Sequence, residues 1–235
     1  MNPWDAPLIK KGMTAQLAKR RARISSGERP IGWKVGLGAP ATMEKMRLAA
    51  PIVGFLMHRA VLLQNGTAAL KGYIKPVAEP EIAVRMARDL PAGATADQAA
   101  AAVKEIFPAI ELADLDPIPA PDNLDAVLEC DIFQRHVVFS DKTRAGLSTS
   151  GLISRVYRRG TETNVTDDPE ALTGKLPDIV AHVGNTLAAF GEKLAAGDII
   201  ITGSITPPLM IEPDEMELTH VLEPIGKVSV RFMRN

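Results

Sequence analysis

Two closely spaced glutamates inside an apolar strand constrain the fold of this chain more than any other feature. Residues 75–86 read KPVAEPEIAVRM, and apolar residues flank Glu79 and Glu81 on both sides. Alternate residues of a strand point to the same side, with Cα atoms about 6.5 Å apart, so the two carboxylates share one face. Pro80 between them has no N–H to donate to a neighbouring strand, which predicts a sheet margin or a bulge here.

A third glutamate, Glu111, lies in the similarly apolar stretch FPAIELADL. If all three carboxylates are buried together, desolvation and mutual repulsion prevent them from staying ionised without compensation. The negative charge could be compensated by bound protons, by paired lysine or arginine side chains, or by a bound cation. A site made only of carboxylate oxygens favours Mg²⁺ or Mn²⁺ over zinc. The alternative is that both strands are half-exposed and the glutamates face water.

Composition predicts a soluble globular protein. The 235 residues suffice for one large domain or two small ones, and they are 46% hydrophobic and 23% charged with a net charge of −1. This balance gives no support for a nucleic-acid or membrane partner, and an aromatic content of 4% argues against base-stacking platforms. One cysteine precludes an intramolecular disulfide, and we expect a cytoplasmic protein.

Hydrophobic periodicity and turn residues predict many strands with a few covering helices. The sequence contains a capping box at Thr95–Gln98 and a QNG turn at 64–66 that predicts a hairpin. A strong helical period starts at Leu176, with Gly197 as the predicted exit. The other predicted elements are a helix over 6–24, strands within 31–38, 52–70, 75–86, 105–116 and 198–204, loops and short strands over 141–175, and strands near 215–222 and 227–233.

Five short motifs follow one another along the chain. They are GWKVGL, VAEPEIAVRM, PAIELAD, GDIIITGSITPP and GKVSVRF. From about residue 30 to the end, the chain resembles the fumarylacetoacetate hydrolase superfamily, and most closely its 2-keto-4-pentenoate hydratase branch. The resemblance implies an α+β fold, a β-rich mixed-sheet roll with packed outer helices. It also implies a single catalytic domain over 1–235, with an N-terminal helical segment over about 1–50 and a β-rich metal-binding core over about 51–235.

The resemblance also implies roles for individual residues. Glu79, Glu81 and Glu111 would hold Mg²⁺ or Mn²⁺. Lys34 would be catalytic, reaching the substrate carboxylate or relaying a proton; otherwise it is a surface lysine or a counter-charge to the glutamates. Ser204 and Thr206 would bind a substrate carboxylate, although a turn after a strand favours such residues in any case.

Two segments depart from the pattern of the branch. His58 and Arg59 stand where hydratases usually carry an acidic pair, and VLECDIF replaces a helix that contains Asp-Asn. We expect His58 and Arg59 to line the substrate site, where Arg59 would favour a substrate with a second carboxylate. The hydrolase branch carries a His–Glu pair on an N-terminal lid, and no such pair occurs in the first 60 residues, which argues against C–C bond hydrolysis.

The resemblance therefore implies a Mg²⁺-dependent hydratase, a lyase that adds water to a small 2-oxo or 2-hydroxydienoic acid during the breakdown of aromatic compounds. A decarboxylase of a vinylogous 2-oxo acid needs the same chelation and is the alternative enzyme. A non-catalytic member that keeps the metal site is the alternative of another class. The family usually forms homo-oligomers, and we expect one here.

Overall fold

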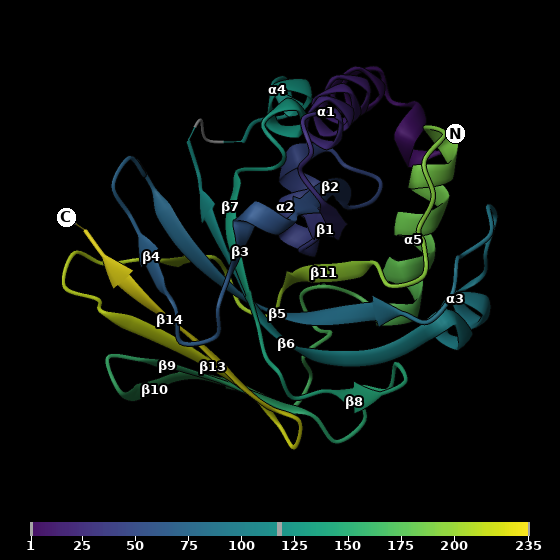
Figure 1. Ribbon diagram of the computed structural model, residues 1–235. Helices are drawn as coiled ribbons and strands as arrows, with labels where there is room; N and C mark the ends of the chain where they lie inside the picture. The colour runs from purple at the N-terminus through teal and green to yellow at the C-terminus, as the bar shows by residue number, and fades with distance from the viewer. Residues whose placement is uncertain (1, 117–118, 235) are drawn as a thin grey trace.

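The computed structural model describes residues 2–116 and 119–234, whose strands form two sheets (Figure 1). The nine-stranded sheet has the order β2-β1-β11-β5-β6-β7-β3, with β12 paired to β5 and β8 paired to β6. Its strands are β1 (Pro30–Gly36), β2 (Ile52–Met57), β3 (Val61–Leu62), β5 (Pro76–Met86), β6 (Val103–Asp114), β7 (Gln134–Phe139), β8 (Arg144–Ala145), β11 (Ile199–Ser204) and β12 (Leu209–Met210). The five-stranded sheet has the order β10-β9-β13-β14-β4, with strands β4 (Thr67–Ala69), β9 (Ile153–Arg158), β10 (Thr161–Thr166), β13 (Glu217–Glu223) and β14 (Gly226–Met233).

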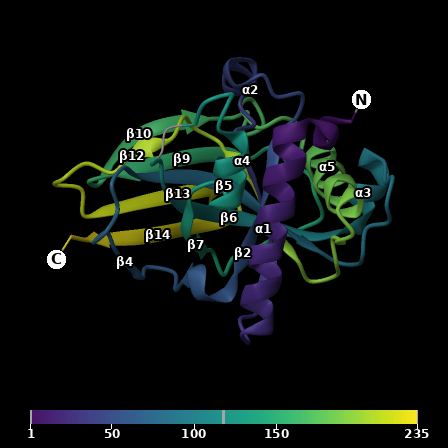
Figure 2. The ribbon, with the colours of Figure 1, turned by 90° about the horizontal axis from the view of Figure 1, so that it is seen from above.

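The helices gather on the side of the large sheet away from the five-stranded sheet (Figure 1). They are the short 3-10 helices η1 (Pro3–Asp5) and η2 (His58–Ala60), and α1 (Pro7–Ser25), α2 (Pro40–Met46), α3 (Ala96–Ala102), α4 (Leu124–Glu129) and α5 (Leu176–Ala189). Seen from above, α1 runs across the molecule between α4 and α5 (Figure 2). None of the helices in the described part of the chain is long and apolar enough to cross a membrane.

The glutamate strand β5 lies in the interior of the large sheet, paired with β6 along its whole length from Pro76–Asp114 to Met86–Val103. The predicted sheet margin at Pro80 is therefore wrong. The irregular pairing lies instead between β5 and its other neighbour, β11, whose register against β5 shifts between Ile201 and Ser204. Pro80 there accepts a hydrogen bond from the Ile205 N–H, which needs no donor from the proline.

Two apolar layers fix which way the glutamates point. Ile110 and Leu112 of β6 pack against Val228 and Val230 of the five-stranded sheet. Because neighbouring residues of a strand face opposite sides, Glu111 between them points to the helical side of the sheet. The sheet thus presents this carboxylate away from the inter-sheet core.

The predicted α+β fold with a β-rich mixed sheet and outer helices is confirmed. The helix predicted over 6–24 is α1, and the capping box at Thr95 and Gln98 starts α3. Strand β1 lies in the predicted N-terminal helical segment and is part of the large sheet. The single catalytic domain stays a prediction.

Two local predictions are wrong. The QNG turn forms, with the Gly66 N–H donating to Leu63 O, but it does not close a hairpin. Strand β3 before it pairs with β7, and β4 after it pairs with β14 of the other sheet. Helix α5 ends at Ala189, and Gly191 at φ +74° follows it, so the helix ends before the predicted exit at Gly197.

Candidate active site

The three glutamates predicted from the sequence converge at one point. Glu79 of β5 lies directly opposite Glu111 of β6, and Glu81 follows two residues along the same strand. One carboxylate oxygen from each lies within 4.8 Å of the others. Glu81 and Glu111 are each 1% exposed, while Glu79 is partly exposed where it lines a cavity. The half-exposed, water-facing alternative is thereby excluded for Glu81 and Glu111.

Lys34 reaches this cluster from β1, with its side chain 2% exposed. Its Nζ donates to Glu111 Oε1 and, at 3.1 Å, to the carbonyl oxygen of Ile132. Burial by itself would lower the pKa of Lys34, but the charges of Glu111 and Glu79 outweigh it and raise the pKa. The side chain is therefore a charged ammonium and not a surface lysine.

One ammonium cannot balance three clustered carboxylates, of which two are buried. Burial, reinforced by the charge of Glu111, raises the pKa of Glu79 to about 7. Burial and the neighbouring carboxylates raise the pKa of Glu81 well above its usual range, although the Gly203 N–H donates to Glu81 Oε2 at 2.7 Å. Burial also raises the pKa of Glu111 against the opposing effect of Lys34. The cluster needs further positive charge or bound protons at neutral pH.

A further buried carboxyl group beside the cluster, Asp131, was missed by the sequence predictions. It is 8% exposed, and its Oδ1 accepts a hydrogen bond from the Phe55 N–H at 2.8 Å. Burial raises the pKa of Asp131 to about 8. A Cβ added at Gly54 would lie 2.8 Å from both Asp131 Oδ1 and Lys34 Cγ, so the two side chains share the space left by this glycine.

The backbone around Asp131 is also unusual. Asp131, Ile132 and Phe133 have φ angles of 59°, 52° and 66°, which is uncommon for residues other than glycine. This turn presents the Ile132 carbonyl to Lys34. No residue pattern signals such a turn, since Asp131 stands in the mixed stretch VLECDIFQRH, where Glu129 precedes it and Gln134 follows.

A cavity of about 430 Å³ lies over the cluster. Ser204 and Thr206 both line it, and their binding of a substrate carboxylate stays a prediction. The buried Ser204 Oγ has no hydrogen-bond partner among the described residues, whereas Thr206 Oγ1 donates to Pro207 O at 2.9 Å. Its other lining residues are Lys34, Val35, Gly36, Leu37, Gly38, Ala39, Ala41, Thr42, Glu79, Glu81, Ala113, Leu115, Pro119, Ile132, Phe133, Leu172, Thr173, Thr202, Gly203, Pro207 and Pro208.

His58 and Arg59 do not line this cavity, which corrects their expected place in the substrate site. They lie in η2, where the chain turns away after β2, and both side chains are exposed. The backbone N–H of His58 donates to Arg29 O and holds this turn at the edge of the sheet. We therefore leave both residues out of the candidate site.

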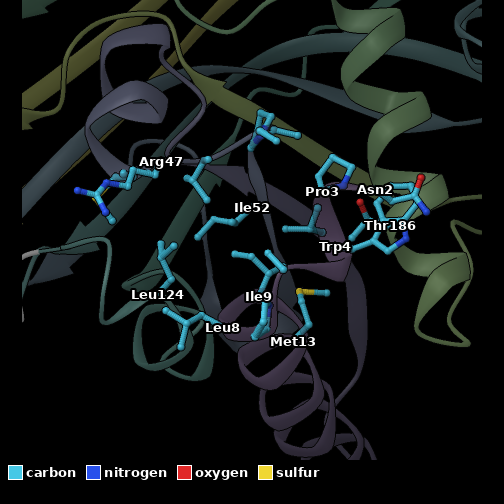
Figure 3. A pocket seen from close by; sticks show the side chains of 18 of the residues that line it. Asn2, Pro3, Trp4, Leu8, Ile9, Met13, Arg47, Ile52, Leu124 and Thr186 are labelled. Atoms are coloured by element: carbon cyan, nitrogen blue, oxygen red, sulfur yellow. The ribbon is translucent and has the colours of Figure 1, made fainter.

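A second cavity, of about 590 Å³, lies between the N-terminal segment, the loop before β2, and α5. Figure 3 shows mainly apolar side chains around it, among them Trp4, Ile9, Met13 and Ile52. Asp122 is the one carboxylate in its described lining. The described lining of this second cavity therefore offers no cluster of groups for metal or acid-base chemistry.

Known proteins resemble this chain over most of its length, although no family model matches it. A 2-hydroxyhexa-2,4-dienoate hydratase of Comamonas testosteroni is 28% identical over 219 residues, which are 90% of this chain and 81% of the relative. A 4-oxalocrotonate decarboxylase of Pseudomonas putida is also 28% identical, over 99% of this chain and 88% of the relative. Further relatives, 27% identical, are 2-keto-4-pentenoate hydratases.

Solved structures agree with the sequence relatives. The 4-oxalocrotonate decarboxylase of Pseudomonas putida G7, complexed with magnesium and adipate, superposes with a TM-score of 0.85 and 25% identity, over 94% of this chain and 85% of that one. The resemblance predicted from the motifs is thus confirmed.

Proposed function

Given a chain with the fold and the relatives of the 2-keto-4-pentenoate hydratase branch, we propose that it is a metal-dependent hydratase of a small 2-oxo or 2-hydroxydienoic acid from aromatic-compound catabolism. The observation that carries the proposal is the convergence of Glu79, Glu81 and Glu111 beside a buried Lys34 beneath a cavity. Three carboxylates and one ammonium leave a charge deficit that a divalent cation would fill.

The donor set fits such a cation. It consists of carboxylate oxygens, which hard ions prefer. The buried Glu111 Oε2 has no hydrogen-bond partner in the described chain, and is therefore available as a ligand. We propose Glu79, Glu81 and Glu111 as the ligands and Mg²⁺ or Mn²⁺ as the ion. When bound, such an ion supplies a Lewis acid that stabilises negative charge developing on the 2-oxygen of the substrate.

Residues beside the glutamates would bind the substrate and orient the ligands. The Lys34 ammonium lies where it can attract the substrate carboxylate and hold or release a proton at Nζ. The Gly203 N–H keeps Glu81 oriented toward the cluster. Ser204 Oγ, without a partner in the described protein, is a donor for the substrate carboxylate. We keep Thr206 as a wall residue, because its hydroxyl already donates to Pro207 O.

The test is a panel of 2-hydroxydienoates followed by ultraviolet absorbance, with and without Mg²⁺, and identification of the products. We expect the dienol absorbance to be lost only with the metal, and a hydrated 2-oxo acid to form. Glu81→Gln keeps the size of the side chain and the acceptor for Gly203, so we expect an intact fold and at least about 100-fold weaker Mg²⁺ binding. Unchanged Mg²⁺ affinity in this variant would contradict the assignment of the ligands.

Decarboxylation of a vinylogous 2-oxo acid is the second candidate, favoured by the superposition on the decarboxylase at a TM-score of 0.85. The same assay separates the two, since decarboxylation releases CO₂ and hydration does not. A chain that binds Mg²⁺ but converts none of the acids would be the non-catalytic member. We also propose a homo-oligomer in the cytoplasm, which sedimentation and fractionation would test.

A further inference from the structure

Building on the proposed function, we propose that the substrate carries one carboxylate only and ends in an uncharged, alkyl-like tail. The proposal rests on the groups that line the cavity, and it reverses the preference for a second carboxylate that the sequence suggested through Arg59. That side chain is exposed in η2, outside the cavity.

Ionisable groups are scarce in the wall of the cavity. Within the described lining they are Lys34, Glu79 and Glu81. The Lys34 ammonium already donates to Glu111 and Ile132. It is also the group proposed to meet the first carboxylate of the substrate, so no further lysine, arginine or histidine of the described lining remains for a second one.

Hydroxyl groups do not replace the missing cation. Three of the four lining threonines already donate to carbonyl oxygens: Thr202 to Ile82 O at 2.9 Å, Thr173 to Gly174 O at 3.1 Å and Thr206 to Pro207 O at 2.9 Å. The fourth, Thr42, offers an uncharged hydroxyl, which does not neutralise a carboxylate. Ser204 is the last residue of β11, directly after Gly203, the donor to Glu81, and it pairs with Glu81 across the strands, so its hydroxyl lies at the glutamate end of the cavity. Much of the remaining surface is apolar, formed by Val35, Leu37, Leu115, Ile132, Phe133 and Leu172.

The charge balance points the same way. The three glutamates are neutralised by Lys34 together with one divalent cation, so the first substrate carboxylate already adds an excess negative charge. A second carboxylate would be desolvated against apolar walls, without a counter-charge and near the first one. An unpaired buried charge is among the costliest groups to bury, whereas a methyl or methylene group gains from the same surroundings.

Binding of two matched acids tests this independently of turnover. We would titrate Mg²⁺-loaded protein with 2-oxohexanoate and with 2-oxohexanedioate, which share a chain length and differ in one terminal carboxylate. We expect the monoacid to bind at least about 30-fold more tightly. Equal or tighter binding of the diacid would overturn the proposal, as would failure of both acids to bind.

Turnover of the matched dienols separates this inference from the proposed function. Tighter binding of the monoacid without hydration of the methyl-ended dienol would leave the inference standing and refute the hydratase. Hydration with a preference for the carboxylate-ended dienol would refute this inference and leave the hydratase standing.

A variant then probes the wall itself. Leu172 is a partly exposed lining residue, so Leu172→Arg adds a cation there, and Leu172→Met is its uncharged control. We expect the arginine variant to shift the diacid-to-monoacid affinity ratio at least about tenfold toward the diacid relative to the methionine variant. If the fold of the Leu172→Arg variant is impaired, Leu115→Arg against Leu115→Met repeats the comparison. An unchanged ratio in a folded arginine variant would contradict the missing cation as the cause of selectivity.

Discussion

At the scale of single residues, Lys34 carries the positive charge that faces the glutamate cluster, buried and bonded to Glu111. We expect Lys34→Met to raise the KM for the 2-oxo acid at least about tenfold, because the variant loses the buried charge that we propose as the partner of the substrate carboxylate. Mg²⁺ affinity should not fall, since the removed charge repels the ion. Lys175→Met is the control, because this side chain is 68% exposed and pairs with Glu170. Steady-state kinetics and metal titration measure both effects, and unaltered kinetics in Lys34→Met would leave this residue as a counter-charge only.

Asp131 is a second residue whose role can be tested on its own. Asparagine at this position keeps an acceptor for the Phe55 N–H and tolerates φ near +59°. Alanine leaves that N–H unpaired in the interior and strains the backbone. We expect Asp131→Ala to lower the free energy of unfolding by about 2–4 kcal/mol and Asp131→Asn by about 1 kcal/mol or less. Urea denaturation measures both, and equal losses would show that the hydrogen bond to Phe55 is not what stabilises the turn.

At the scale of elements, His220 of β13 links the two sheets. Its Nδ1 lies 3.1 Å from the carbonyl oxygen of Ala109 in β6, and its Nε2 lies 3.1 Å from Ser154 Oγ in β9. Burial lowers the pKa of His220 to about 4. The unfolded chain, with its ordinary pKa near 6.5, therefore binds a proton that the folded protein rejects.

The stabilising contribution of His220 depends on pH. The contribution of neutral His220 is fully present above pH 6.5 and is lost as the pH falls toward 4. Its full size is on the order of 3 kcal/mol. We expect His220→Gln to flatten this part of the pH profile of unfolding, because glutamine does not titrate there. Urea denaturation between pH 4 and 7 measures the slope, and parallel profiles of the two proteins would refute the assignment.

The elements also show how far sequence reasoning reaches. The glutamate strand was predictable, since alternation in KPVAEPEIAVRM places Glu79 and Glu81 on one face, and β6 supplies Glu111 through regular pairing. The QNG turn was recognisable as a turn, but local residues cannot show that β3 and β4 pair with distant strands in different sheets. The expected place of Arg59 in the substrate site was wrong for the same reason. The sequence does not show to which side the chain turns after β2.

The turn at Asp131 lay beyond reach for another reason. Three successive non-glycine residues with positive φ contradict local preference and persist because the hydrogen bonds to Phe55 and Lys34 hold them. Such a segment is specified by its surroundings and not by its own residues. The convergence of Glu79, Glu81 and Glu111 could therefore be predicted from the chain, while the turn that presents a carbonyl oxygen to Lys34 could not.

At the scale of the whole molecule, the glutamate cluster projects from β5 and β6 in the middle of the large sheet, so its charge state acts on the stability of the entire fold. With a folded pKa of about 7, Glu79 keeps a proton that the unfolded chain releases near its ordinary value of 4.5. Without metal, stability should therefore fall as the pH rises between these two values, by at most about 3 kcal/mol from Glu79 and less because it is partly open to the cavity.

A divalent cation should reverse this trend, because it binds the deprotonated carboxylates of the folded state and competes with protons for them. We expect the melting temperature in EDTA to fall between pH 6 and pH 8. Added Mg²⁺ should raise it more at pH 8 than at pH 6. Glu79→Gln removes one titrating carboxylate, which is a proposed ligand, so the melting temperature of this variant should fall less in EDTA and rise less with Mg²⁺. Differential scanning calorimetry at both pH values measures the decline in EDTA and the gain from Mg²⁺ for the wild type and for the variant. A wild-type gain from Mg²⁺ that is equal at both pH values, or that persists in full in Glu79→Gln, would show that the cation binds elsewhere.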